Sequence, residues 1–231
     1  MKKTIYLLGV IAIIASSCNT TEVITRNVAY KGIYDQKPLA VLLMPPINKS
    51  TNVEAKEYFH STLNVPLANA GYYVIPPFLS MEILKKESAY DSELFLNGSL
   101  NKFGEVFGAD VALFTIINKW DKSALASKIY VEVEYILKSI STNEIIYQRK
   151  GNITYDTSIA SSGGGLAGAL VSMAASAINT AATNYMVVAR AANSYTFKDI
   201  PSGKYSPDYG TDGDLPAGLK DFSVRLNSNY K

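Results

Sequence analysis

Three short, almost continuous apolar segments constrain the fold of this chain more than any other feature of its sequence. They are Leu39–Met44, Tyr72–Ile75 and Val111–Ile117, and a proline pair directly follows each of the first two. Apolar runs of this length are typical of strands that are buried on both faces, as in a parallel sheet. Apolar residues at helical spacing between Val53 and Ala70 separate the first two segments. This β-α-β order predicts a parallel sheet covered by helices.

A different pattern follows these segments. From Ile129 to Lys138, residues alternate between two faces, one of which is charged, and this is typical of a half-exposed strand. A turn then leads to Glu144–Arg149, which we expect to be the hairpin partner of that strand. Asn152–Tyr155 is expected to extend this partner after a bulge at Gly151. The pattern therefore predicts an α/β fold with a mixed, mainly parallel sheet and an antiparallel hairpin at its edge.

The stretch from Ser161 to Asn193 is rich in glycine and alanine and has no charged residue before Arg190. Small residues recur in it every four positions, at Gly164, Gly168, Ser172 and Ser176. This spacing lets a helix approach a neighbour closely. We expect a helix that packs tightly on the sheet or on a second subunit. A transmembrane helix, or a segment that refolds into membrane strands upon oligomerisation, is the alternative.

The N-terminus has the order of parts found in a bacterial signal peptide. Two lysines precede the apolar run Ile5–Ala15, which is too short to span a bilayer as a helix. Two serines then precede Cys18, the only cysteine, which therefore cannot form an intramolecular disulfide. Its position resembles that of a lipobox cysteine, although Ala15 stands where leucine is commonest. We expect cleavage after residue 17 and fatty acyl chains, such as palmitate, on Cys18.

The residues after the cysteine suggest a location and a domain order. Asn19 stands where many inner-membrane lipoproteins have aspartate, so we expect an outer-membrane lipoprotein that faces the periplasm, with surface exposure as the alternative. We interpret residues 18–36 as a polar tether and residues 37–195 as the α/β domain. Residues 196–231 are rich in Gly, Pro, Asp and Tyr and are expected to form an extended tail.

Charge and motifs limit the possible chemistry. Removal of Lys2 and Lys3 from the 22 basic residues leaves 20, equal to the acidic residues, so no electrostatic surface for nucleic acid is expected. The glycines after Ser162 lack the lysine of a phosphate-binding loop. His60, the only histidine, has no triad order around it, and Glu132 and Glu134 are interpreted as a solvated strand face. We therefore expect no enzyme activity, cofactor, metal or small-molecule substrate.

Four stretches, together with the lipobox, resemble a family of bacterial lipoproteins of unknown function that includes a neisserial surface antigen. They are Val41–Asn48, Tyr58–Leu63, Pro66–Pro76 and Phe103–Asp110. The resemblance covers most of residues 37–150, and its motifs are structural rather than catalytic. That family is similar in fold to the N-terminal domain of TolB, to the secretion lipoprotein CsgG and to LpoB. The resemblance implies a three-layer α/β domain that acts by binding or assembly.

The sequence thus predicts a non-enzymatic outer-membrane lipoprotein. It would be attached to the membrane by lipid on Cys18 and would bind an envelope protein or associate with itself. One alternative is a component of a CsgG-like secretion channel, with Ser161–Asn193 as its membrane-active part. The other is an envelope hydrolase, which would require His60 or the carboxylate pair to lie in a deep pocket.

Overall fold

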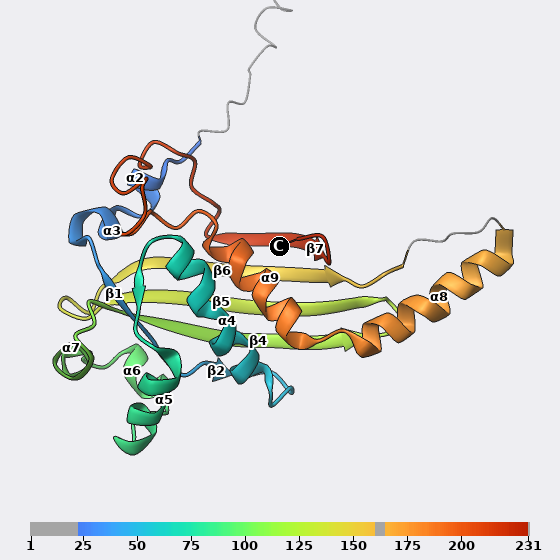
Figure 1. Cartoon of the computed structure of the whole chain (residues 1–231), viewed down its shortest axis with the longest axis horizontal. Coiled ribbons are helices and arrows are strands. Elements are labelled where there is room, and N and C mark those ends of the chain that lie inside the picture. Colours follow the sequence, from blue (N-terminus) through green and yellow to red (C-terminus); the bar gives the residue numbers. More distant parts are fainter. Residues whose placement is uncertain (1–22, 160–164, 231) are drawn as a thin grey trace, which may run out of the picture.

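The computed structural model describes residues 23–159 and 165–230, and within these ranges seven strands form one mixed sheet. The strand order is β3-β1-β4-β5-β6-β7, and β2 pairs separately with β4 (Figure 1). The strands are β1 (Ala40–Leu43), β2 (Ile47–Asn48), β3 (Tyr73–Val74), β4 (Val111–Ser123), β5 (Lys128–Ser139), β6 (Ile145–Asp156) and β7 (Asp221–Asn227).

The parallel part of the sheet is confirmed. β1 pairs in parallel with both β3 and β4, and Val41 to Leu43 are fully buried. Successive side chains of a strand point to opposite faces. Leu43 accordingly belongs to the apolar cluster on one face of the sheet, and Leu42 belongs to the cluster on the other. Burial on both faces explains why this segment is apolar without alternation.

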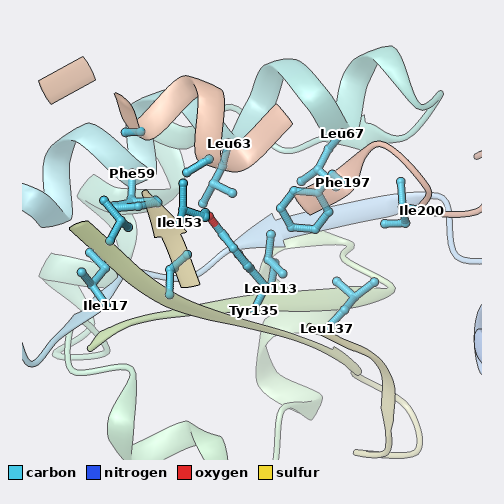
Figure 2. Close-up of a cluster of buried hydrophobic side chains, with 14 of the residues drawn as sticks. Phe59, Leu63, Leu67, Leu113, Ile117, Tyr135, Leu137, Ile153, Phe197 and Ile200 are labelled. Carbon is cyan, nitrogen blue, oxygen red and sulfur yellow. The ribbon is translucent and has the colours of Figure 1, made fainter. Parts of the chain in front are cut away.

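Helices cover both faces, which confirms the three-layer arrangement. On one face lie α4 (Ala55–Asn69) and α9 (Tyr185–Phe197) (Figure 1). On the other lie α5 (Pro77–Lys86), α6 (Glu93–Leu96) and α7 (Asn101–Phe107). Figure 2 shows the first cluster, where side chains of α4 and α9 meet the sheet, among them Phe59, Leu63, Leu67, Ile117, Tyr135 and Phe197.

Several tyrosines anchor this core through their hydroxyl groups. The Tyr135 hydroxyl donates a hydrogen bond to Asn193 Oδ1 of α9, and Asn193 Nδ2 donates to Thr62 Oγ1 of α4 at 2.8 Å. The Tyr147 hydroxyl donates to the Thr196 carbonyl at 2.9 Å. Buried tyrosines keep a polar end that requires a partner, so these contacts fix α9 in position over β5 and β6.

The prediction of an extended tail is wrong for residues 221–227. Residues 221–227 form β7, which pairs in parallel with β6 and buries Phe222 and Leu226 in the core. The antiparallel hairpin of β5 and β6 forms as predicted, but it is not the edge of the sheet because β7 occupies that edge. The gain from burying two large apolar side chains explains why this segment joins the sheet.

The prediction of a bulge at Gly151 is also wrong. Gly151 pairs regularly with Val133, and the irregularity in the hairpin lies between Leu137 and Lys138. A Cβ atom at position 151 would lie 2.5 Å from the Phe222 ring. Glycine is required at this position because the aromatic ring packs directly on the strand backbone.

The expected tether is already folded from Ile24 onward. Ala217 N donates to the Ile24 carbonyl and Arg26 N donates to the Leu215 carbonyl, both at 2.9 Å. The helices α2 (Arg26–Ala29) and α3 (Lys31–Gln36) follow. Tyr30 and Ile33 are buried in the main core, and this burial holds the segment on the domain. The expected signal peptide and Cys18 lie outside the described residues.

Candidate interaction site

The glycine- and alanine-rich stretch forms two helices with opposite surroundings. Asn184 separates α8 (Gly165–Ala182) from α9, and its side-chain oxygen accepts a hydrogen bond from Met186 N at 2.8 Å. Asparagine is favoured at this N-cap position because it satisfies a free N–H of the first turn. The single helix expected for this stretch is therefore interrupted at Thr183 and Asn184.

The helix α9 is part of the core. Its buried side chains include Val188, Ala192 and Phe197, and it packs against α4. The small alanine side chains let the two helices approach closely. This half of the stretch is a core helix, held in place by its buried face.

The helix α8 extends beyond the end of the sheet as an arm (Figure 1). Leu170, Val171, Met173 and Ile178 on it are each at least 59% exposed. No charged residue occurs in the sequence between Asp156 and Arg190. A surface helix normally carries charged side chains on its solvent face, whereas a helix without them is usually covered. The outer side of α8 is therefore an apolar surface that the described chain leaves exposed.

The C-terminal part of α8 is attached to the domain and is called the base of the arm. Ser176 Oγ accepts a hydrogen bond from Ile159 N at 2.8 Å, and Asn179 Nδ2 donates to the Thr157 carbonyl at 2.7 Å. The buried hydroxyls of Thr180 and Thr157 also contact each other. These contacts join α8 to the segment that leaves β6.

Lys122, near the end of β4, binds the last turn of α8. Its Nζ donates hydrogen bonds to the Ala181 carbonyl at 2.9 Å and the Thr183 carbonyl at 3.2 Å. It also lies 4.4 Å from the centre of the Tyr185 ring. A cation at a helix C-terminus satisfies free carbonyls and interacts favourably with the helix dipole. Burial lowers the pKa of Lys122. No sequence motif identified this residue.

The small residues predicted for close packing have different surroundings. Ser176 is buried at the base of the arm, and Gly168 and Ser172 are half-buried farther along it. Gly164 lies outside the described residues. Ser176 contacts the segment after β6, not another helix. A role of Gly168 and Ser172 in packing against a partner stays a prediction.

The candidate catalytic residues do not come together. His60 is buried in α4, where burial lowers its pKa, and its Nε2 has no hydrogen-bond partner among the described residues. Glu132 pairs with Lys150 at 2.8 Å and Glu134 accepts from Gln148 Nε2 at 2.6 Å. These are cross-strand pairs on the outer face of the hairpin.

Two further features of the described residues concern metals and membranes. Within these ranges no three histidine, cysteine, aspartate or glutamate residues gather as a metal site would require. Among the helices that the structure describes, none combines the length and the apolar character needed to cross a bilayer.

Comparison with known proteins gives a family match over most of the chain. Residues 28–203 match the family described as "Putative lipoprotein GNA1162-like". A lipoprotein of Neisseria meningitidis serogroup B, NMB1124/NMB1162, is 25% identical over 185 residues, which cover 77% of this chain and 82% of that protein.

Solved structures of low sequence identity were also found. The lipoprotein GNA1162 of Neisseria meningitidis is 21% identical, with a TM-score of 0.47 over 64% of this chain and 100% of that one. The C-terminal domain of LpoB from Salmonella enterica is 15% identical, with a TM-score of 0.36 over 55% of this chain and 94% of that one.

Proposed function

The chain belongs to the GNA1162-like lipoprotein family, and from this premise we propose that it is a non-enzymatic envelope lipoprotein that binds a partner protein through α8. Its anchor is lipid on Cys18, which holds the domain at the periplasmic side of the outer membrane. The single observation that supports a binding role is the exposed, uncharged apolar side of α8.

The occupant that we propose for α8 is a protein with an apolar groove. A helix of 18 residues is roughly 27 Å long, so it presents several turns to such a groove. Helices that lie on a membrane surface carry a polar face rich in lysine and arginine, and α8 has no charged residue. Without such a face, α8 cannot interact electrostatically with lipid headgroups. Contact with a protein groove, which removes its apolar side chains from water, is therefore favoured.

A CsgG-like channel requires the whole stretch from Ser161 to Asn193 to enter a membrane. The burial of α9 argues against this, because Asn193 joins α4 to β5 through hydrogen bonds inside the core. An envelope hydrolase also lacks support, since the carboxylates of the hairpin pair with neighbouring side chains and His60 is buried.

Cross-linking in intact cells tests this function. Tagged protein is purified under denaturing conditions from wild-type cells and from cells that carry Val171→Glu or, as the matched control, Leu125→Glu. Leu125 is 91% exposed in the turn between β4 and β5. We expect a cross-linked protein that Val171→Glu removes and Leu125→Glu retains. Cross-linked copies of the chain alone would indicate self-assembly, and a pattern unaffected by Val171→Glu would refute the role of α8.

A further inference from the structure

An apolar groove of about 770 Å³ lies where the N-terminal segment crosses the start of β6. Tyr30, Ile146 and Tyr147 form its floor and are buried. Its rim consists of apolar side chains that are more than half exposed, namely Val23, Ile24, Val28, Ile145 and Leu219. Scattered exposed apolar side chains are normal, but a contiguous group around a groove indicates a binding surface.

The rim belongs to a fixed part of the structure. Main-chain hydrogen bonds join residues 24–27 to residues 213–217, including Asn27 N to the Gly213 carbonyl at 2.9 Å. Asp212 accepts from Arg26 Nη1 and from the Tyr34 hydroxyl, both at 2.9 Å. These contacts hold the apolar side chains of two distant segments side by side.

The rim lies close to the expected anchor in the sequence. Five peptide steps separate Cys18 from Val23, and a fully extended chain spans at most about 3.6 Å per residue. Val23, the first residue of the rim, is therefore within roughly 18 Å of a lipid-bearing Cys18. In Figure 1, α2 and α3 lie at the end of the molecule opposite the N-terminal end of α8.

We propose that this groove is the face through which the domain contacts the lipid bilayer, with the rim side chains among the acyl chains at the interface. The inference rests on the proposed lipid anchor at Cys18. The short connection keeps the rim at the membrane surface, where insertion removes these side chains from water.

The bilayer is a more favourable occupant of this face than the protein's own acyl chains. An acyl chain that moved from the membrane into the groove would exchange one apolar environment for another, and the outer rim would stay in water. When the rim rests on the bilayer, the acyl chains remain in the membrane and the rim also leaves water. Membrane contact therefore removes more apolar surface from water.

Site-specific fluorescence tests the proposal on the mature, lipidated protein. Lipid occupies the sulfur of Cys18, the only cysteine, so a single added cysteine supplies one free thiol for a polarity-sensitive fluorophore. The variants are Val28→Cys, Leu219→Cys and the control Leu125→Cys. Each labelled protein is reconstituted into vesicles of phosphatidylethanolamine and phosphatidylglycerol. Quenching is measured with aqueous iodide and with lipids that carry brominated acyl chains. Flotation with the vesicles measures the anchor separately.

We expect brominated lipids to quench the probes at 28 and 219 but not at 125, and iodide quenching to be several-fold weaker at 28 and 219. Equal iodide quenching at all three positions would overturn the proposal. Protection from iodide at 28 and 219 without quenching by brominated lipids would also overturn it, because the protein's own acyl chain would then cover the groove. A protein that does not float would overturn the anchor, and the membrane contact with it.

Discussion

Ser176 accepts a hydrogen bond from the backbone N–H of Ile159 at 2.8 Å, and this contact determines which side of α8 faces the domain. Ser176 is buried, whereas Val171 and Ile178 on the same helix are 70% exposed. Ser176 thus lies on the side of α8 that faces the domain, and the larger apolar residues remain available for a partner.

Ser176→Leu should loosen the arm. The larger side chain cannot fit against the segment after β6, and overpacking typically costs about 1–3 kcal/mol. We expect faster amide hydrogen exchange in α8 while the exchange of β4 and β5 stays unchanged, as measured by mass spectrometry. Ala174→Leu, on the exposed side of the same helix, is the control and should not accelerate exchange. Equal exchange in both variants would mean that Ser176 does not hold the arm.

Gly151→Ala should destabilise the edge strand β7. The added methyl group would collide with the Phe222 ring, at an expected cost of about 1–3 kcal/mol in the free energy of unfolding. Phe222→Leu removes the ring, so in urea denaturation the double variant should lose less stability than the sum of the single variants. Strict additivity of the two substitutions would refute this packing explanation.

The stability of the region where β6 pairs with β7 should depend on the charge of Asp156. Burial raises the pKa of Asp156, but hydrogen bonds from Ser158 and the Arg225 guanidinium outweigh that effect and hold the pKa at about 2. A pKa below the ordinary value of 3.8 means that the charged form stabilises the fold above about pH 4. This contribution is lost as the pH falls toward 2.

Asp156→Asn measures this contribution. At pH 7 we expect a loss of about 1 kcal/mol in the free energy of unfolding, since Arg225 is largely exposed and solvent weakens the pair. The difference from wild type should shrink as the pH falls from 4 to 2. Asp35→Asn on α3 is the control, because its pair with Lys31 is fully on the surface. A difference that stays constant down to pH 2 would exclude this explanation.

Cys18→Ser should remove the chain from the outer-membrane fraction, because no other acyl acceptor of this kind is present in the sequence. Metabolic labelling with radioactive palmitate, followed by density-gradient fractionation, measures both acylation and location. Ser17→Ala keeps a small residue before the cleavage site and should behave like wild type. A Cys18→Ser protein that remains in the outer membrane without label would disprove the lipid anchor.

The parallel strands were predictable because burial on both faces leaves a direct mark on sequence, as at Leu42 and Leu43. β7 was missed although Phe222, Val224 and Leu226 alternate with polar residues. The surrounding glycines and prolines obscured this short strand, which becomes stable only by pairing with β6. Alternation alone is a sufficient signal for such a strand, and it could have identified β7.

The candidate site was only partly predictable. The small residues and the absence of charge identified the stretch, and Asn184 offered a recognisable N-cap within it. The exposure of α8 could not be predicted, because it depends on contacts of Thr157 and Lys122 with residues far along the chain. Such contacts leave no local pattern in the sequence.

Photo-cross-linking along α8 in intact cells tests the central claim most directly. A photoreactive residue is placed singly at Leu170, Val171 or Ile178, which are exposed, and at Ser176, which faces the base of the arm. Our account predicts a cross-linked partner protein from the three exposed positions and none from position 176. Equal cross-linking from all four positions, or none from any of them, would contradict a partner-binding role for α8.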